Sequence, residues 1–392
     1  MIRKLKNLAH LILGWTAGLV YGFPARKITI IGVTGTDGKT TTTSLIYHIL
    51  NYSGHKTAMI TTVGAYLNGE EHRIGLHVTT PSAWTLQKFL RDAVRTGHKF
   101  AVIETSSHGI DQNRIAGIPY RVAVITNITH EHLDYHKSFE EYARVKFKLL
   151  KKASIAVINL DDAKISSLAP LLKNNIVTYS RLSNADYTPA KYPFKTKLFG
   201  SFNESNCLAA IASVKQFSIP DDQIKEALEV FKAPLGRQDI VYDKEFKVMV
   251  DFAHTPNSIE NILREVKNTH PKRLIHLFGA PGHRDQDKRP MMGQASAQYA
   301  DVIILTADDP REEKVENICA QIRKGISGAF EINKNLFEVY DRKEAIKMVI
   351  SMAQPGDFIV LTGKGHEAGL ALSGGDVPWN EREIVLEIIK GK

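Results

Sequence analysis

A chain of 392 residues with 43% hydrophobic content can bury substantial cores, which favours two or three domains and excludes a small module held together by disulfides. The two cysteines, Cys207 and Cys319, lie far apart and have no C-x-x-C partner, so neither a disulfide framework nor a zinc site is predicted, and a cytoplasmic location is expected. The net charge of +9 comes from scattered basic residues, which fit an acidic, phosphate-bearing substrate and argue against a nucleic-acid partner.

Residues 1–26 predict a separate apolar helical segment. Basic residues at positions 3, 4 and 6 precede an apolar run at 8–23, a pattern that superficially copies a signal peptide. The run has no A-x-A-like cleavage site, and it falls short of the roughly 20 residues that a membrane-spanning helix needs. We therefore expect a helix that packs on the body of the protein, with peripheral membrane contact through residues 8–23 as the functional alternative.

From Lys27 onward, short β-rich runs alternate with helical patterns, which is typical of parallel sheets covered by helices. The first half predicts one such domain, with strands that are too β-branched and continuous to be half-exposed antiparallel strands. These strands are expected at 28–33, 57–62, 100–104, 122–127 and 155–160.

The alternation is interrupted and then starts again in the second half. Residues 180–202 are polar and contain proline, two helices are expected from about 204 to 231, and residues 233–237 predict a linker. Five further strands are expected at 247–252, 273–278, 302–306, 336–340 and 358–362. The predicted fold is therefore α/β, with a central P-loop-type parallel-sheet domain at 27–232 and a smaller Rossmann-like α/β domain at 237–392.

The first predicted strand leads into a glycine loop and then a helix, which is the context that a phosphate-binding loop requires. Gly35 and Gly38 let the backbone curl so that its N–H groups and the helix N-terminus face a polyphosphate, Lys39 neutralises charge there, and Thr40 can hold Mg²⁺. The loop departs from the general G-x-x-x-x-G-K-[ST] form, because Val33 stands where the first glycine would be. A chance turn is the alternative, and the matching strand and helix argue against it.

Acidic and imidazole side chains follow two later strands of the same predicted sheet. Glu104 ends one strand, and such strand ends face the ligand crevice of open parallel sheets, so this carboxylate could coordinate Mg²⁺ beside the phosphates. The next strand leads into residues 127–136, where three histidines and two acids crowd seven positions. One of them is expected to be a metal ligand, with a solvated loop acid at Glu104 and an ordinary surface histidine as the alternatives.

These residues resemble the motifs of the Mur ligases, and more closely those of the enzymes that add the third residue of the peptidoglycan stem peptide. The resemblance rests on the runs 35–40, 104–108, 127–136, 142–146, 200–206, 236–237, 251–256, 282–293, 308–311 and 363–367. It implies an ATP-dependent ligase of peptidoglycan precursor synthesis. Such an enzyme activates the carboxylate of a UDP-N-acetylmuramoyl-dipeptide-like substrate as an acyl phosphate and joins it to a diamino acid, meso-diaminopimelate or L-lysine.

The resemblance also implies an ATP site with two Mg²⁺ ions. Thr40, Glu104 and His132 would be metal ligands, and Lys146 would be carbamylated, which replaces its ammonium with an anion able to bind the second ion. The helical pattern alone predicts that Lys146 is a solvated helix residue. Lys39, Glu104, His132 and Lys146 form the implied catalytic set. The implied ATP-binding residues are Gly35, Thr36, Asp37, Gly38, Lys39, Thr40, Thr41, Asn206, Arg237, Asp251 and His254.

Two further sets of residues would hold the substrates. By the same resemblance, the muramoyl peptide would contact Thr79, Thr80, Ser106, Gln112 and Arg114. The incoming amino acid would contact Arg284, Asp308, Asp309, Arg311, Gly363 and Glu367. Arginines clamp carboxylates with paired hydrogen bonds and a glutamate can receive a distal ammonium, so the second set suits a zwitterion. Because different domains would hold the two substrates, closure about the linker near Gly236 is expected. The chain is also expected to be a monomer.

Two departures from the family pattern leave questions open. The family's enzymes normally begin with a domain that grips the uridine nucleotide, yet only about 26 residues precede the first predicted strand. That domain is expected to be missing, which leaves three alternatives. The central domain binds the nucleotide loosely, the substrate is not UDP-linked, or a partner protein binds the nucleotide. Asp309 stands where enzymes that choose meso-diaminopimelate usually have Asn, which favours lysine, whereas Arg311 favours a second carboxylate on the substrate.

Three other functions are alternatives. A folylpolyglutamate-type or cyanophycin-type ligase of the same superfamily is the nearest, and the runs 106–114 and 363–367 argue against it. A regulatory or nucleic-acid-binding ATP module would fit the positive charge and predicts salt-sensitive DNA binding. A membrane-associated assembly factor would act through residues 8–23.

Overall fold

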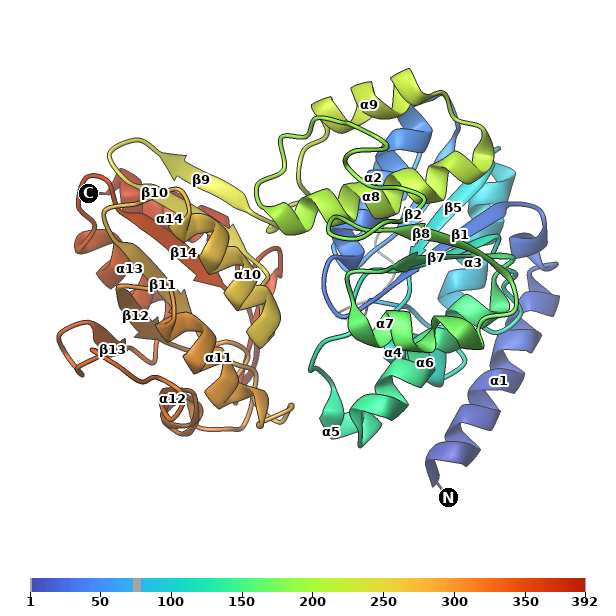
Figure 1. Cartoon of the computed structure of the whole chain (residues 1–392). Coiled ribbons are helices and arrows are strands. Elements are labelled where there is room, and N and C mark those ends of the chain that lie inside the picture. The colour runs from blue at the N-terminus through green and yellow to red at the C-terminus, as the bar shows by residue number, and fades with distance from the viewer. Residues whose placement is uncertain (1, 73–78, 392) are drawn as a thin grey trace. The chain divides into compact units, whose positions relative to one another are not determined.

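The computed structural model describes residues 2–72 and 79–391 of the chain. Met1 and Lys392, the outer ends of the predicted N-terminal segment and C-terminal domain, lie outside the described residues, as do the side chains of Arg3, Lys4 and Asp134. The chain divides into two compact units (Figure 1). Unit 1 comprises Met1–Thr129 and His136–Lys232, and unit 2 comprises His130–Tyr135 and Ala233–Lys392.

Unit 1 is built on an eight-stranded sheet in the order β4-β3-β2-β5-β1-β6-β7-β8. In this order, neighbouring strands from β2 through β5, β1, β6 and β7 to β8 pair in parallel. The pairs β2–β3 and β3–β4 are antiparallel. The central strands are buried along almost their whole length, which explains their continuously apolar sequences. The strands are β1 (Thr29–Thr34), β2 (Thr57–Ile60), β3 (Ala65–Leu67), β4 (Glu70–His72), β5 (Phe100–Glu104), β6 (Val122–Ile125), β7 (Ile155–Asn159) and β8 (Asn175–Tyr179).

Helices cover both faces of this sheet. On one face, Ile46 of α2 and Leu208 of α8 join Val124 of β6 in a buried core. On the other face, Leu149 of α6 approaches Gly32 of β1. The helices of unit 1 are α1 (Ile2–Val20), η1 (Pro24–Arg26), α2 (Lys39–Tyr52), α3 (Ala83–Arg95), α4 (Ser107–Asp111), α6 (Phe139–Lys152), α7 (Ala163–Leu168), η2 (Ala169–Leu171), α8 (Ser201–Val214), η3 (Lys215–Phe217) and α9 (Asp221–Val230), and α5 (Leu133–His136) crosses the boundary between the units.

Unit 2 contains a six-stranded sheet in the order β13-β12-β11-β14-β10-β9, in which β9 is an antiparallel edge strand and the other pairs are parallel. Its core includes Val250, Leu277 and Leu361 from the sheet and Ile346 from a helix. The strands are β9 (Asp239–Asp243), β10 (Lys247–Asp251), β11 (Leu274–Phe278), β12 (Val302–Leu305), β13 (Leu336–Glu338), β14 (Phe358–Thr362), and the hairpin β15 (Gly369–Leu372) with β16 (Gly375–Pro378). The helices are α10 (Pro256–Lys267), α11 (Lys288–Ala297), α12 (Val315–Arg323), α13 (Arg342–Ser351) and α14 (Glu381–Lys390).

Local sequence explains where many helices begin. The residue just before the first helical turn often has an extended backbone and a polar side chain. Its side-chain oxygen accepts a hydrogen bond from an N–H group of the first turn, which has no partner within the helix. The residues that cap helices in this way are Ser82, Ser106, Ser138, Asp162, Thr255, Asp341 and Asn380.

The predicted α/β fold is confirmed, with a large sheet dominated by parallel strands and a second, smaller sheet. Each predicted strand corresponds to an observed strand, and the ends differ by no more than two residues. The sequence did not predict β3, β4, β8, β9, β15 and β16. These strands lie at the edge of a sheet, next to the edge strand in the case of β3, or in the separate hairpin. β3 has only three residues, and β4 and β16 are exposed at every position, so these strands lack the continuous apolar pattern that marked the central strands.

The parallel register brings the motif-bearing strand ends of unit 1 to one edge of the sheet. Val33 of β1 pairs with Glu104 of β5, and Thr34 pairs with Ile125 of β6. The glycine loop, the segment after Glu104 and the segment after Ile125 therefore leave the sheet side by side, at the edge where ligands bind in open parallel sheets.

The N-terminal apolar run forms α1, whose neighbour in the fold is α3. Within the part of the chain that the structure describes, no helix combines the length and the apolar character needed to cross a membrane.

Candidate active site

The glycine loop of unit 1 needs glycine for two reasons, conformation and space. Gly35 and Gly38 have φ angles of 148° and 79°, which L side chains rarely adopt. A Cβ at Gly35 would clash with Thr126 Oγ1, and one at Gly38 would clash with Asn206 Oδ1. Val33, which stands at the first glycine of the general motif, still lies in β1 and is fully buried, so a side chain fits there.

Asn127 occupies two of the loop's N–H groups. Its Oδ1 accepts hydrogen bonds from Thr36 N at 3.2 Å and from Asp37 N at 2.8 Å. The Thr126 hydroxyl donates to Asp37 O at 2.6 Å and closes the loop further. The N-terminus of α2, which begins at Lys39 directly after this loop, is the kind of helix end at which anions bind.

Lys39 and Asn206 lie beside this helix end. Lys39 Nζ donates to Thr36 O at 2.7 Å, which holds the ammonium over its own loop. Asn206 of α8 accepts from the Thr42 hydroxyl at 3.2 Å and is bonded to Asn203, so a second helix is fixed against the loop. The positive end of α2 and a lysine together fit a polyphosphate.

Glu104 lies at the centre of the unit 1 site. Its side chain is 1% exposed, and its carboxylate accepts three hydrogen bonds of 2.9 Å each, from the Thr40 hydroxyl, Thr62 N and the Thr62 hydroxyl. Among the described residues these donors are uncharged, and a buried carboxylate is costly without a cation nearby. Carboxylate and hydroxyl oxygens are the ligands that Mg²⁺ prefers, so Thr40 and Glu104 fit a magnesium ion.

Lys146 of α6 contacts the same loop. Its side chain is 1% exposed, Nζ donates to Gly35 O at 2.5 Å, and the ammonium lies 4.3 Å from the centre of the Tyr142 ring. The Tyr142 hydroxyl lies 3.0 Å from the Thr36 hydroxyl. Lys146 is thus a buried residue in contact with the phosphate loop, and the helical pattern by itself, which predicts a solvated residue, is wrong here.

His132 lies in a different unit from the other residues expected to be metal ligands. It belongs to the segment His130–Tyr135, which groups with unit 2, whereas Thr40, Glu104 and Lys146 belong to unit 1. Its φ of 57° is left-handed, and its Nδ1 lies 3.8 Å from Glu131 Oε1. Glu131 in turn forms a buried ion pair of 3.1 Å with Lys288 of α11, which anchors this segment in unit 2.

The five residues expected to hold the muramoyl peptide form one connected network. The Thr80 hydroxyl lies 3.1 Å from the Ser106 hydroxyl and accepts a hydrogen bond from Ser106 N at 2.9 Å. Arg114 donates to Thr80 O at 2.7 Å and to Gln112 Oε1 at 3.0 Å. The Thr62 hydroxyl, which also bonds to Glu104, lies 3.0 Å from the Thr79 hydroxyl.

Thr62 and Asn127 are therefore functional candidates that the sequence did not single out. Thr62 joins the peptide-side network to the carboxylate beside the phosphate loop, and Asn127 shapes the loop itself. Asn127 follows a predicted strand within a noted motif, but Thr62 ends an ordinary β-rich run and gave no signal.

In unit 2, the residues expected to contact the nucleotide surround Phe252. The Arg237 guanidinium lies 4.4 Å from the centre of the Phe252 ring, and His254 Nδ1 lies 2.8 Å from Phe252 O. Asp251 accepts from Gln238 N and Ala253 N, both at 2.7 Å. These contacts hold the segment after Gly236 against the end of β10.

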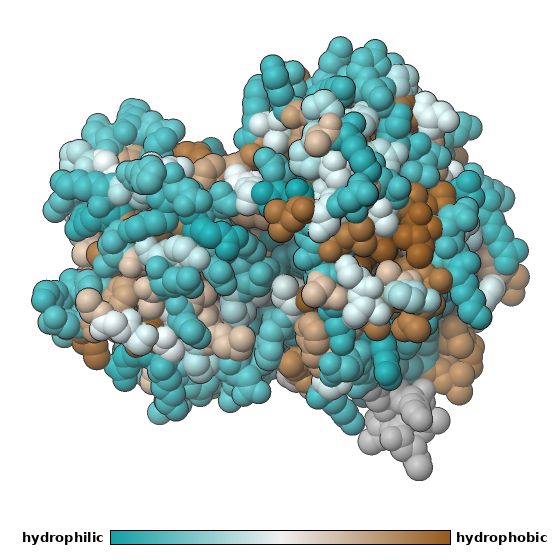
Figure 2. Space-filling model, in the orientation of Figure 1, coloured by the Kyte–Doolittle hydropathy of each residue, from teal (hydrophilic) through white to brown (hydrophobic). Residues whose placement is uncertain are grey.

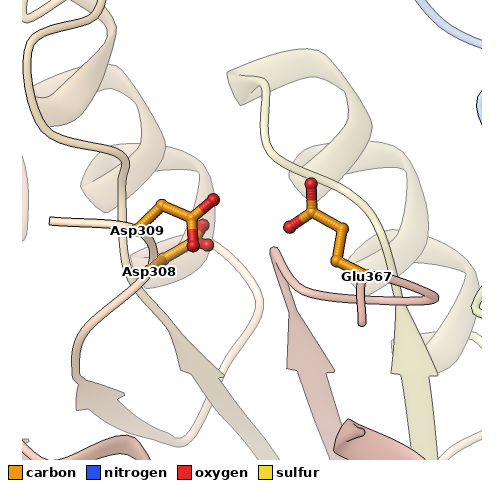
Figure 3. Close-up of side chains that lie close together, drawn as sticks. All are labelled: Asp308, Asp309 and Glu367. Carbon is orange, nitrogen blue, oxygen red and sulfur yellow. The ribbon is translucent and has the colours of Figure 1, made fainter. Parts of the chain in front are cut away.

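The residues expected to bind the amino acid include a cluster of three carboxylates. Figure 3 shows Asp308 and Asp309, which follow β12, facing Glu367 from the loop after β14. Oxygen atoms from the three groups lie within 4.8 Å of one another. Lys364 Nζ donates to Asp309 Oδ1 and to Glu367 Oε2, both at 2.6 Å, so a protein cation already neutralises part of the cluster.

Burial and charge set the proton affinities in this cluster. Burial raises the pKa of Glu367 to about 7, although Lys364 opposes the shift, and Asp308 adds to it. Burial also raises the pKa of Asp308. Burial lowers the pKa of Lys364, but the carboxylates of Asp308, Glu367 and Asp309 raise it more, so the net shift is upward and the lysine stays charged.

The loop that contains Asp309 and Arg311 is held in a strained conformation. Both residues have positive φ angles, 46° and 53°. Asp309 Oδ1 accepts from Ala371 N at 2.9 Å, and Arg311 donates from its backbone N to Ala371 O at 3.0 Å and from its guanidinium to Gly282 O at 2.8 Å. Arg284 is exposed and lies two residues beyond Gly282 in the same loop, without a described contact to the three carboxylates.

Arg342 braces the two loops that supply these carboxylates. It is fully buried in an ion pair of 2.6 Å with Glu381, and it also donates to Ala307 O at 3.0 Å and Thr362 O at 2.8 Å. Ala307 directly precedes Asp308, and Thr362 directly precedes Gly363. The two loops approach each other closely, because a Cβ at Gly363 would clash with Asp308 Oδ2. The sequence did not single out Arg342, because an arginine at the start of a helix usually faces solvent.

Comparisons with known proteins identify the family that the chain resembles. The Mur ligase middle domain matches residues 33–214, and the Mur ligase, glutamate ligase domain matches residues 236–365. The UDP-N-acetylmuramoyl-L-alanyl-D-glutamate–2,6-diaminopimelate ligase of Aquifex aeolicus is 38% identical, across 97% of this chain and 81% of that protein.

Solved structures agree as well. One of a ligase with the same name is 33% identical, with a TM-score of 0.62, and covers 93% of this chain and 78% of its own. Folylpolyglutamate synthase of Mycobacterium tuberculosis, at 16% identity, has a TM-score of 0.73 over 90% of this chain and 92% of its own, which shows a shared fold alone.

The predicted enzyme class, an amide-forming ligase of an ATP-dependent family that typically uses Mg²⁺, is confirmed by the two family matches and the identity to named ligases across most of the chain. The chain belongs to the Mur ligase family.

Proposed function

We propose that this protein adds a diamino acid to a UDP-N-acetylmuramoyl-dipeptide-like substrate through an acyl phosphate, in peptidoglycan precursor synthesis. The main support is the continuous hydrogen-bonded path in unit 1 from Thr40 through Glu104 and Thr62 to Thr79. This path supports the proposal because it connects residues expected to bind a polyphosphate with residues expected to bind a peptide carboxylate, and phosphoryl transfer to a carboxylate needs the two substrates side by side.

In this proposal the protein contributes mainly position and charge. Lys39 and the N-terminus of α2 hold the triphosphate, and Arg114 orients the peptide from its contact with Thr80. Two Mg²⁺ ions, when bound, absorb the charge that develops on the phosphoryl oxygens. Thr40 and Glu104 would hold the first ion, and Lys146, as a carbamate, would hold the second together with His132. Closure about the segment near Gly236 would then bring the amino acid to the activated carbonyl.

The proposed amino acid is one with a carboxylate at each end, as in meso-diaminopimelate. Asp309 stands where an uncharged Asn is usual, but its Oδ1 is held by Lys364 Nζ and by Ala371 N, so its charge is offset within the protein. Toward a ligand it should therefore act much as Asn would. The Arg311 guanidinium, with donors beyond the one directed to Gly282 O, then favours a second carboxylate on the substrate. The related ligases, whose names specify 2,6-diaminopimelate, support this choice.

A phosphate-release assay with the full chain tests the proposal. UDP-N-acetylmuramoyl-dipeptide and the same muramoyl dipeptide without UDP are each combined with ATP, Mg²⁺ and a panel of amino acids. We expect release that depends on meso-diaminopimelate and disappears in Lys39→Ala. Asp309→Asn should keep the preference, whereas Arg311→Ala should lower kcat/KM for meso-diaminopimelate by at least about tenfold and leave lysine unaffected. Preference for lysine in the wild-type chain would contradict the amino-acid choice, and absence of amino-acid-dependent release would contradict the function.

Further parts of the proposal concern the whole chain. We propose a cytoplasmic monomer divided into an N-terminal segment at 1–26, an ATP-binding domain at 27–232 and an amino-acid-binding domain at 237–392. A peripheral membrane contact through residues 8–23 belongs to the same proposal. The two cysteines, both buried and free, fit a reducing compartment.

A further inference from the structure

One face of α1 is apolar and exposed. Leu8, Ile12, Trp15 and Leu19 follow the spacing of a single helix face, and their exposed fractions are 53%, 60%, 48% and 69%. Leu13 and Val20 flank this row and are also exposed. Figure 2 shows hydrophobic residues beside the grey atoms at the N-terminal end of the chain. Single exposed leucines are ordinary, but a continuous row of this kind indicates a surface that binds something.

The opposite face of α1 fixes the helix in place. Ala17 is fully buried, a Cβ at Gly14 would press on Ala116, and one at Gly18 would press on the Phe23 ring. The exposed row is therefore held outward by packing on the small residues behind it. It is not the result of a helix that hangs free.

The charges around this row are mainly positive. The first 36 residues contain five lysines and arginines and no acidic residue. On α3, Trp84, Lys88, Arg91 and Arg95 again follow the spacing of one helix face. This basic stripe borders the end of α1, because the Tyr21 ring lies 5.9 Å from the Trp84 ring and 4.8 Å from the Arg91 guanidinium. Asp92 pairs with Arg91 at 3.0 Å.

We propose that α1 and the basic stripe of α3 form one docking surface for an anionic lipid membrane. The apolar row would enter the acyl boundary, the exposed Trp15 and Trp84 would lie at the headgroup level, and the lysines and arginines would contact lipid phosphates. The proposal extends the contact proposed for residues 8–23 by naming the lipid class and the second helix. It is independent of the ligase reaction.

Charge also argues against a second copy as the occupant. Both ends of α1 are basic, with Lys6 near one end and Arg26 and Lys27 after the other. If two copies paired through this row, parallel or antiparallel helices would bring like charges together, which opposes association. A lipid phosphate surface neutralises both ends at once.

Vesicle flotation of the full chain tests the surface. We expect binding to vesicles of phosphatidylcholine with phosphatidylglycerol, little binding to phosphatidylcholine alone, and release at high salt. Ile12→Ser with Leu19→Ser, and separately Lys88→Gln with Arg95→Gln, should each lower the partition coefficient by roughly tenfold or more. Leu182→Ser, at a leucine that is 79% exposed, and Lys244→Gln serve as matched controls and should bind as the wild type does.

Three results would overturn the proposal. They are failure of the wild-type chain to float with anionic vesicles, binding by both double variants that equals that of the wild type, and a wild-type dimer in sedimentation velocity that Ile12→Ser with Leu19→Ser converts to monomer. The last result would make the row a self-association surface. Unchanged phosphate release in both double variants would show that they are folded and keep this test separate from that of the ligase.

Discussion

Thr62 is the residue through which the two halves of the unit 1 site are connected. Its N–H and hydroxyl both donate to Glu104, and its hydroxyl also lies 3.0 Å from that of Thr79. A hydrogen bond to a charged group stabilises by more than one between neutral groups, so loss of this hydroxyl should be felt mainly by the carboxylate.

Thr62→Val should therefore weaken Mg²⁺-dependent turnover while it leaves the fold intact. Removing one donor from the buried carboxylate is expected to lower kcat by roughly tenfold and to raise the Mg²⁺ concentration for half-maximal rate. Thr62→Ser should restore both, and Thr269→Val, at an exposed threonine of unit 2, is the control. A Thr62→Val protein with unaltered magnesium dependence would show that Thr62 has no positioning role.

Glu367 predicts how activity should vary with pH. Burial raises its pKa to about 7 from an ordinary value of 4.5, so below neutrality the carboxyl is protonated and cannot pair with a distal ammonium. The KM for the diamino acid should fall as pH rises through about 7, and Glu367→Gln should remove that dependence and keep KM high throughout. Glu344→Gln, at an exposed glutamate of α13, should behave as the wild type.

The raised pKa of Glu367 should improve binding of the diamino acid as pH rises, but it should lower the stability of the fold over the same pH range. Between pH 4.5 and about 7 the unfolded chain loses the Glu367 proton and the folded chain keeps it, so this group lowers the free energy of unfolding as pH rises through that window. A KM for the diamino acid that stays constant from pH 6 to 8 would contradict the assignment of Glu367 to the amino acid.

At the scale of elements, α13 and α14 are coupled to the ends of β12 and β14 through Arg342. The ion pair with Glu381 is fully buried, and the guanidinium also donates to the carbonyls of Ala307 and Thr362. A buried pair of this kind contributes little net stability but is costly to break on one side.

Arg342→Met should lower the free energy of unfolding by about 3–5 kcal/mol, because it leaves Glu381 buried and unpaired. Arg342→Met with Glu381→Gln should recover most of that loss, since both charges are gone and Gln can still accept from Trp379. Urea unfolding measures the stability. The double variant should nevertheless have a raised KM for the amino acid, because neither loop is braced; an unchanged KM would mean that the brace has no part in binding.

The sequence predicted the elements with the strongest patterns and missed those without one. Continuous β-branched runs marked the buried parallel strands, because both faces of such strands are covered. The short antiparallel strands β3 and β4 and the hairpin β15–β16 depend on pairing partners, which local composition does not reveal.

The same reasoning applies to the candidate site. Gly35, Gly38 and Lys39 are contiguous and could be predicted from spacing. Thr62, Lys364 and Arg342 act across the fold, and their partners lie 42, 55 and 39 residues away in the chain. A side chain whose partner is that distant gives no local signal, and for this reason Asp309 could not be interpreted until its contact with Lys364 was known.

At the scale of the whole molecule, the proposed reaction needs both units. The phosphate loop and the peptide-side network lie in unit 1, and the carboxylate cluster with Arg311 lies in unit 2. Gly236 follows the boundary at Lys232, and its φ of 66° together with its close approach to Gly365 leaves no room for a side chain. Closure is thus expected to involve this glycine segment.

Closure predicts a more compact chain during turnover. The radius of gyration from small-angle X-ray scattering should decrease when ATP, Mg²⁺, dipeptide substrate and amino acid are all present, and it should stay at the ligand-free value in Lys39→Ala. If the wild-type value does not change under turnover conditions, the proposed closure is wrong.

The central claim, activation of a carboxylate as an acyl phosphate, is tested most directly by isotope transfer. The dipeptide substrate is labelled with ¹⁸O in its terminal carboxylate and converted with ATP and the diamino acid. When a carboxylate oxygen attacks the γ-phosphorus and the amine then displaces phosphate from the carbonyl, that oxygen leaves with the phosphate. We predict one ¹⁸O in each inorganic phosphate released. Amide product accompanied by unlabelled phosphate would contradict the mechanism.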